Sequence, residues 1–120
     1  MTRAFALLTA VTLLAGCERA PEVVLRLQGT VISIGYAKPV KNAEVQIEWP
    51  KELGGGSSTT KTDAEGHYAI GRTVRTRELD CKGVVITVHA DGFASAYNQS
   101  NEDCAAGHLT ADFKLFPLPG

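Results

Sequence analysis

The chain has 120 residues, of which 44% are hydrophobic and 21% are charged, and 12 basic residues stand against 13 acidic ones. A chain of this length can bury one modest core and is expected to form a single domain. A net charge of −1 gives no strong basic field to release counterions from phosphates, so nucleic acid is not an expected partner.

Residues 1–16 have the order of a cleaved export signal. Arg3 is the only charged residue before Glu18, and residues 4–15 are apolar apart from two threonines. This run is too short to cross a bilayer, because a transmembrane helix needs about 20 apolar residues. A positive start, a short apolar stretch and small residues before a cleavage site are typical of a secretory signal. We therefore expect an N-terminal signal helix that is removed from the mature protein.

Leu14-Ala15-Gly16-Cys17 closes this segment and resembles the lipobox of bacterial lipoproteins. The resemblance implies that the Cys17 sulfur carries lipid, that acyl chains such as palmitate anchor the protein, and that residues 17–22 form a lipidated tether. Glu18 follows in place of an aspartate, which by analogy with the sorting rule of Gram-negative lipoproteins favours the outer membrane, with the body facing the periplasm. The alternative is an ordinary export signal cut nearby, with Cys17 as a third structural cysteine.

Period-two alternation of apolar and polar residues predicts that residues 23–120 form strands, each with one buried face. In the clearest strand, 43–49, every second residue is apolar and Trp49 shares the side expected to face the core. Turn-forming aspartate and glycine residues separate the strands, as at 63–66 and 91–92. No sustained helical pattern follows residue 22. The other predicted strands are 23–34, 58–62, 67–71, 84–90, 93–98 and 109–115.

Several short segments between residues 25 and 116 resemble the carboxypeptidase regulatory-like and transthyretin-like family. The resemblance implies an all-β, antiparallel sandwich of about seven strands, either immunoglobulin-like or transthyretin-like. In that fold Gly29 lets strand backbones approach closely, and Asp63 bonds nearby amides before Gly66 reverses the chain. The segments that carry the resemblance are Gly29-Thr30-Val31, Pro39, Asn42-Ala43-Glu44-Val45, Thr59-Thr60-Lys61-Thr62-Asp63, Gly66, Tyr68, Ile70 and Val88-His89-Ala90-Asp91-Gly92-Phe93.

With Cys17 assigned to lipid, Cys81 and Cys104 remain as an even pair in an oxidising compartment, and a disulfide is expected. Closing a loop of about 24 residues would contribute about 3 kcal/mol. The alternative is a metal site that combines Cys104 and His108 with His89 or His67. Two cysteines and scattered histidines lack a closed ligand pattern, so we expect no metal and no cofactor.

The motifs predict a lipid-anchored structural or interaction (binding) module without catalytic activity of its own. The wider fold includes a purine-pathway hydrolase with a serine-containing C-terminal motif, which the end of this chain, 115–120, lacks. No zinc-protease motif occurs. The expected partners are the membrane and an envelope protein or glycan.

Two surfaces are candidates for binding. Arg72, Arg75 and Arg77 lie between two predicted strands and could meet anionic headgroups or an acidic partner, although the acidic residues that follow also fit a locally compensated, solvated loop. Tyr97, next to two amide side chains, could suit a sugar or a peptide.

The competing function is a small hydrolase or a carbohydrate-binding accessory domain with a site built from loops. A cluster of His67, His89 or His108 with a carboxylate in a cleft would favour this alternative.

Overall fold

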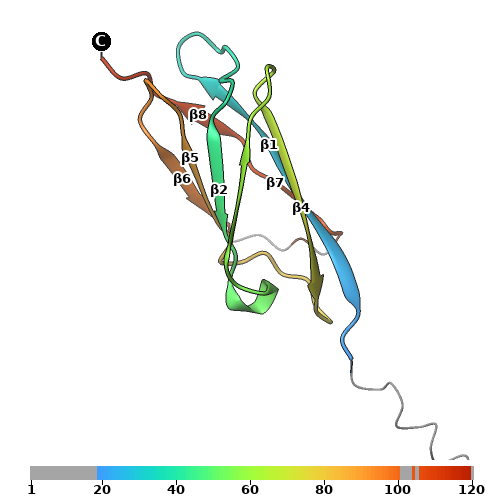
Figure 1. Ribbon diagram of the computed structural model, residues 1–120. Coiled ribbons are helices and arrows are strands. Elements are labelled where there is room, and N and C mark those ends of the chain that lie inside the picture. The colour runs from blue at the N-terminus through green and yellow to red at the C-terminus, as the bar shows by residue number, and fades with distance from the viewer. Residues whose placement is uncertain (1–18, 101–103, 105, 120) are drawn as a thin grey trace, which may run out of the picture.

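The computed structural model describes residues 19–100, 104 and 106–119, and their regular structure is strand apart from one short 3-10 helix, η1 (Lys51–Leu53) (Figure 1). The predicted signal helix and Cys17 lie outside the described residues. No helix in the described part is long and apolar enough to cross a membrane.

The first sheet is built around one long strand, β1 (Glu22–Ser33). On one side β4 (His67–Arg75) pairs with it antiparallel. On the other side two short strands, β7 (His108–Thr110) and β8 (Phe113–Leu115), pair with β1 in parallel, one after the other. This sheet is therefore mixed, and its central strand joins segments from the beginning, the middle and the end of the chain.

The second sheet is antiparallel throughout, in the order β3-β2-β5-β6. Its centre is β2 (Glu44–Glu48), the strand with the clearest alternation in the sequence, which pairs with β3 (Ser57–Lys61) and with β5 (Val85–His89). The edge strand β6 (Ala96–Gln99) pairs with β5.

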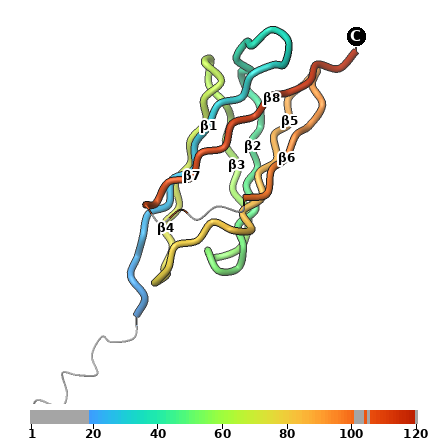
Figure 2. Tube along the Cα trace, turned by 180° about the vertical axis from the view of Figure 1, so that it is seen from behind, coloured from blue at the N-terminus to red at the C-terminus, as the bar shows by residue number. Residues whose placement is uncertain are grey.

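The two sheets face each other and enclose one core (Figure 2). Alternation in the sequence becomes alternation in burial, since Val45 and Ile47 of β2 are buried between exposed neighbours. The prediction of an all-β sandwich is confirmed. The largest side chains with under 2% exposure are Leu25, Leu27, Ile47, Leu53, Ile86, Leu115, Val31, Val45, Val84 and Val88.

The described residues contain eight strands where about seven were expected, because the predicted strand 109–115 is split at residues 111 and 112. At the split, the Ala111 amide donates to Gln28 O at 2.9 Å, and Asp112 Oδ1 accepts the Thr30 amide at 2.9 Å. A side chain thus satisfies a backbone donor that regular pairing would have used. The break separates β7 from β8 while both remain beside β1.

Two other strands begin or end away from their predicted positions. β4 continues to Arg75 rather than ending at residue 71, because β1 provides a pairing partner as far as Glu22. β6 begins at Ala96 rather than at residue 93, because residues 93 and 94 pair with the C-terminal segment instead.

The sandwich has two distinct ends (Figure 1). The tether end is where β1 begins and β4 finishes, and it includes η1 and the loop 76–84. The distal end is where β1 finishes, and it includes the connection 34–43, the turn 62–66, the turn 90–95 and residues 116–119.

Candidate functional site

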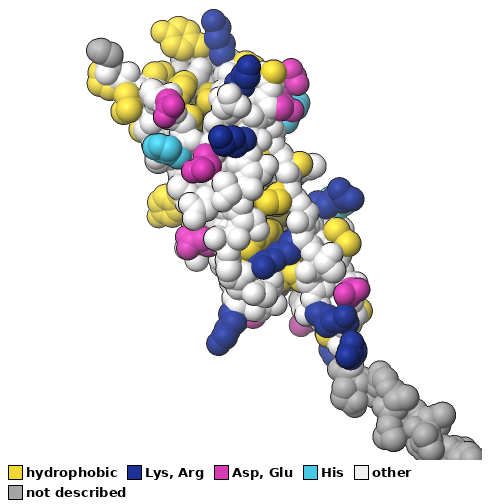
Figure 3. Space-filling model, in the orientation of Figure 1, with side chains coloured by type: hydrophobic (Ala, Val, Ile, Leu, Met, Phe, Trp, Pro, Cys, Tyr) yellow, Lys and Arg dark blue, Asp and Glu magenta, His cyan; other side chains and the backbone are white. Residues whose placement is uncertain are grey.

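An open cleft of about 440 Å³ lies at the distal end, between the connection 34–43 and the turn 90–95. That volume is in the range of sites that take small molecules. Figure 3 shows hydrophobic and basic side chains gathered at this end of the molecule. The residues that line the cleft are Ser33, Tyr36, Lys38, Pro39, Val40, Lys41, Asn42, Ala90, Asp91, Phe93 and Pro117.

One wall of the cleft is the turn 90–95, which the C-terminal segment holds in place. The Ala94 amide donates to Phe116 O at 2.9 Å, and the Leu118 amide donates to Gly92 O at 2.8 Å. Phe93, between these two hydrogen bonds, is partly buried and packs against the core. The phenyl ring is therefore presented from a fixed backbone.

The opposite wall is the connection 34–43, which is folded onto the end of β1. The Ser33 amide donates to Lys38 O at 2.8 Å, and the Val40 amide donates to Val31 O at 2.9 Å. The buried Thr62 hydroxyl donates to Val40 O at 2.6 Å and accepts the Ala43 amide at 2.8 Å. These bonds fix the floor of the cleft, while Tyr36 stands at the rim with 72% of its surface exposed.

The lining combines flat apolar surface with charges of both signs. The Phe93 and Tyr36 rings offer faces for a planar molecule, and Asp91 offers an acceptor for hydroxyl donors. Lys38 and Lys41 add positive charge that favours an anionic group such as a phenolate. The arrangement suits a small aromatic compound that carries hydroxyl groups.

The three arginines predicted as one binding surface are not equivalent. Arg72 and Arg75 belong to β4 rather than to a loop. The Arg72 guanidinium lies 5.0 Å from the centre of the Trp49 ring, and its Nη1 donates to Gly55 O at 2.8 Å. Arg75 contacts the start of the described chain, whereas Arg77 lies exposed in the following loop. Arg72 thus holds the glycine loop 54–56 against the sandwich.

The structure buries Trp49, as its position in the alternation predicted, and exposes Tyr97. Trp49 is 5% exposed, and its indole Nε1 donates to Ser58 Oγ at 2.9 Å. Tyr97 is 72% exposed on the edge strand β6, outside the distal cleft. It remains a predicted contact residue.

The three histidines do not converge on one site. His67 begins β4, His89 ends β5, and His108 begins β7. His89 Nδ1 lies 2.8 Å from Ser95 Oγ at an exposed position. Among the described residues, no group of three or more His, Cys, Asp or Glu side chains could hold a metal ion.

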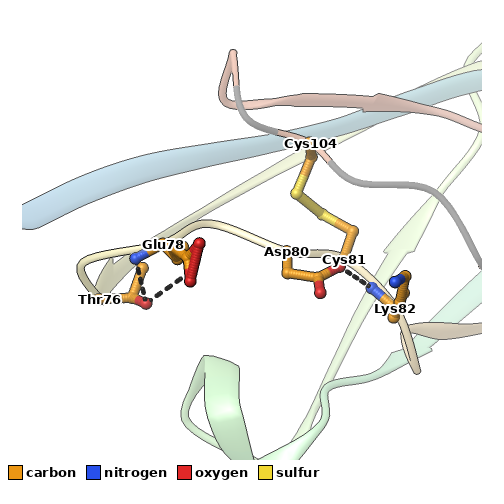
Figure 4. The surroundings of a disulfide bond; sticks show 6 residues. All are labelled: Thr76, Glu78, Asp80, Cys81, Lys82 and Cys104. Carbon is orange, nitrogen blue, oxygen red and sulfur yellow. Dashed lines mark hydrogen bonds between the residues drawn. A yellow bond between two sulfur atoms is a disulfide. The ribbon is translucent and has the colours of Figure 1, made fainter.

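A disulfide joins Cys81 and Cys104, with 5.6 Å between their Cα atoms (Figure 4). Both cysteines are buried. The bond links the loop 76–84 to the segment before β7, so Cys104 is not available to the alternative metal site with His108.

Sequence reasoning missed most of the distal cleft. Tyr36, Lys38 and Lys41 belong to a connecting segment without a motif, and the sequence pattern predicts that Phe93 begins a strand. An available signal was the exposed-loop composition of Gly35-Tyr36-Ala37-Lys38, in which an aromatic ring and a cation share a tight turn.

No family model matches the chain, and a search of curated proteins finds no relative. Several solved structures with a similar sandwich are dioxygenases. A chlorocatechol 1,2-dioxygenase from Pseudomonas putida superposes with a TM-score of 0.58 at 17% identity, over 79% of this chain and 61% of that one. A hydroxyquinol 1,2-dioxygenase from Pseudomonas putida DLL-E4 gives 0.57 at 11% identity, over 80% and 57%.

The dioxygenase domain of a dioxygenase and carbohydrate-binding fusion protein from Streptomyces sp. SirexAA-E superposes with a TM-score of 0.58 at 16% identity, over 85% of each chain. The present chain therefore spans about three fifths of the two Pseudomonas enzymes but most of this separate domain. At these identities the likeness establishes a shared fold.

These comparisons correct the functional prediction. A non-catalytic structural or interaction module was expected, with a hydrolase or a carbohydrate-binding accessory domain as the alternative, but the structural neighbours are dioxygenases. The prediction rests on the absence of catalytic motifs from the sequence, whereas the likeness to these structures, at 10–17% identity, is one of fold. The structural neighbours thus contradict both the interaction-module prediction and the prediction that the chain is not an enzyme.

Proposed function

We propose that this chain is a lipid-anchored domain of the 1,2-dioxygenase fold that takes a small aromatic diol in its distal cleft. The observation that carries the proposal is the lining of the cleft, in which the Phe93 and Tyr36 rings lie beside Asp91 and two lysines. A dihydroxybenzene would place its ring on the aromatic side chains and donate its hydroxyl protons to the Asp91 carboxylate. Lys38 and Lys41 would favour the ionised phenol.

The structural neighbours support the same class of ligand. They are named for activity on chlorocatechol and on hydroxyquinol, which are hydroxylated benzene rings. The cleft of about 440 Å³ is large enough for such a molecule.

Dioxygenase chemistry also needs a group that activates O₂, such as a redox-active metal or an organic cofactor. A protein metal site for that purpose uses converging imidazole and carboxylate ligands. The described residues do not fit this requirement, because no group of three or more His, Cys, Asp or Glu side chains among them lies close enough together to hold a metal ion. We therefore derive ligand recognition from the cleft and no reaction step.

Lipid anchorage is the second part of the proposal. It rests on Leu14-Ala15-Gly16-Cys17 and on the charged and apolar pattern before it, and it implies a location on a bacterial envelope membrane, with Glu18 favouring the outer membrane. The resemblance to the carboxypeptidase regulatory-like family stays a prediction that concerns the fold.

The test is a titration of the full chain with catechol and hydroxyquinol, in which NMR measures the chemical shifts of the backbone amides. Shifts confined to residues 33–42 and 90–93 are expected. Cyclohexane-1,2-diol, which has the hydroxyls but no aromatic ring, should change the amide shifts of these residues far less. If the diols shift no residue of the cleft, or shift distant surfaces equally, the proposal is wrong.

A matched set of variants sharpens the test. Asp91→Asn removes a charge-assisted hydrogen bond and should weaken binding about tenfold. Lys61→Gln, at the end of β3 and not among the residues that line the cleft, should leave binding unchanged. Oxygen consumption with each diol, with and without added iron, identifies catalysis by this chain directly. Uptake of O₂ that is lost in Asp91→Asn would place turnover in the cleft.

A further inference from the structure

The first described residues are held against the end of β4. Arg75 Nη2 lies 3.1 Å from Glu22 Oε2, and its Nη1 donates to Ala20 O at 3.2 Å. The Thr76 amide donates to Pro21 O at 3.1 Å. Backbone and side chain together fix residues 20–22 on the tether end, so the point at which the chain leaves the domain is defined.

The distance from that point to the expected lipid is short. Two residues, Glu18 and Arg19, separate Ala20 from Cys17, so three Cα-to-Cα steps join them, and an extended chain spans at most about 3.6 Å per step. A lipid on Cys17 would therefore keep Ala20 within about 11 Å of the headgroups. A long flexible tether would allow any orientation of the domain, whereas here only residues 17–19 separate the lipid from residues 20–22, which are bonded to the end of β4.

We propose that the sandwich stands on the bilayer on its tether end, with the loop 76–80 against the lipid headgroups and the distal cleft directed away from the membrane. This rests on the lipid anchorage in the proposed function. The ladder from the pair Glu22 and Arg75 to the pair Thr30 and His67 has eight steps, which corresponds to about 26 Å at about 3.3 Å per residue. The distal end, at the opposite end of the sandwich from residues 20–22 (Figure 1), would therefore lie well beyond the headgroup layer.

The charges of the tether end indicate that geometry, rather than attraction to anionic lipid, sets this orientation. Arg75 and Arg77 are followed by Glu78 and Asp80, and Arg75 is already paired with Glu22. Such a mixed surface gains little from a negative membrane. We expect the same orientation on vesicles of phosphatidylcholine alone and on vesicles that also contain phosphatidylglycerol.

The experiment measures the distance of each end from the bilayer. Glu78→Cys places one thiol at the tether end, and Glu65→Cys places one in the turn at the distal end. Both positions are exposed, and both substitutions remove the same charge. The lipidated full chain, with acylation of Cys17 verified by mass spectrometry, is labelled with a fluorophore and reconstituted into vesicles that carry a headgroup-bound quencher.

We expect the Glu78→Cys label to be quenched several-fold more strongly than the Glu65→Cys label, on both vesicle compositions. Equal quenching, or stronger quenching of the distal label, would overturn the proposed orientation. An unmodified Cys17 would instead refute the anchorage, which separates failure of the proposed function from failure of the orientation.

A third variant tests the contacts of Arg75. Arg75→Ala removes the bonds to Ala20 and Glu22 and should reduce the difference between the two labels. Arg26→Ala, on an exposed position of β1, removes the same charge without touching the tether and should leave the difference unchanged. A difference that survives Arg75→Ala intact would show that Arg75 does not orient the domain.

Discussion

At the scale of single residues, the closest approach in the sandwich occurs at Gly29. A Cβ atom built on this glycine would lie 1.8 Å from Ala111 O and 2.8 Å from the Tyr68 hydroxyl. The resemblance noted in the sequence predicted that this glycine allows backbones to approach, and the structure identifies the approaching segment as the break between β7 and β8. The partner was not predictable, because 82 residues separate the two sites in the sequence.

We predict that Gly29→Ala lowers the free energy of unfolding by about 3 kcal/mol or more, because the backbone of residue 111 has to move away from β1. The urea midpoint of the purified domain measures this change. Gly71→Ala is the matched control, since a Cβ there would meet only Leu25 O at 3.8 Å. Comparable losses in the two variants would contradict the argument from close approach.

Tyr68 supplies the hydrogen bond that completes this contact. Its hydroxyl donates to Ala111 O at 2.5 Å, and burial, with a smaller contribution from the Asp112 carboxylate, raises the pKa of Tyr68. Tyr68→Phe leaves the buried carbonyl without its donor and should reduce the free energy of unfolding by about 1–3 kcal/mol.

The raised pKa of Tyr68 also makes the free energy of unfolding depend on pH. Above about pH 10 the unfolded tyrosine loses its proton while the folded one keeps it, so the wild type loses stability as the pH rises toward the folded pKa. Urea midpoints from pH 8 to 11 should show that Tyr68→Phe reduces this alkaline loss. An identical alkaline slope in both proteins would contradict this expectation.

Asp63 makes the stability of the fold depend on pH in the acid range. Its Oδ1 accepts the His67 and Glu65 amides, each at 2.9 Å, and the hydrogen bond from the His67 amide is the main cause of a lowered Asp63 pKa. The stabilisation is present above about pH 3.9, the ordinary aspartate value, and is lost as the pH falls through the folded pKa.

We therefore expect Asp63→Asn to be less stable than the wild type at pH 7 and to approach it below pH 4. Thermal unfolding followed by circular dichroism over that range measures the difference. A constant difference at every pH would show that the Asp63 charge is not responsible.

At the scale of elements, strands with one clean buried face were predictable from their sequence. β2 and β5 lie within one or two residues of their predicted ends, because apolar residues at every second position define both their period and their buried side. The break at Ala111 and Asp112 has no such local signal. It depends on Thr30, Gln28 and Tyr68, which come from other strands.

The disulfide is the covalent link between two elements with little regular structure. It connects residues 23 apart in sequence, which corresponds to about 3 kcal/mol of stabilisation through the unfolded chain. We expect the double variant Cys81→Ser, Cys104→Ser to lose about that much free energy of unfolding in urea while keeping the strand signal in circular dichroism. Unchanged urea midpoints with and without reductant in the wild type would contradict a stabilising bond.

At the scale of the whole molecule, the all-β sandwich was predictable and the distal cleft was not. Alternating strands separated by turns define two facing sheets, whatever the chemistry at their ends. The cleft combines residues 33–42, 90–93 and 117, which three separate connections bring together. The arginines form a charge cluster in the sequence, yet Arg72 bonds the loop 54–56 and Arg75 bonds Ala20 and Glu22.

The proposed anchor makes a prediction for the intact protein in cells. Cys17→Ser removes the sulfur that would carry lipid, so the product should leave the membrane fraction and appear in the soluble fraction. Its urea midpoint should equal that of the delipidated wild type, because the buried core begins at Leu25, beyond the tether. A Cys17→Ser protein that stays with the membrane would contradict lipid anchorage.

Because β1 pairs on both sides, the order in which the chain emerges limits when the first sheet can fold. One neighbour of this strand is β4, but the other consists of residues 108–115, near the opposite end of the sequence. A chain that emerges amino end first, from a ribosome or through a membrane pore, cannot complete its first sheet until almost everything else has followed. Until then the edge of β1 that pairs with β7 and β8 has no partner strand.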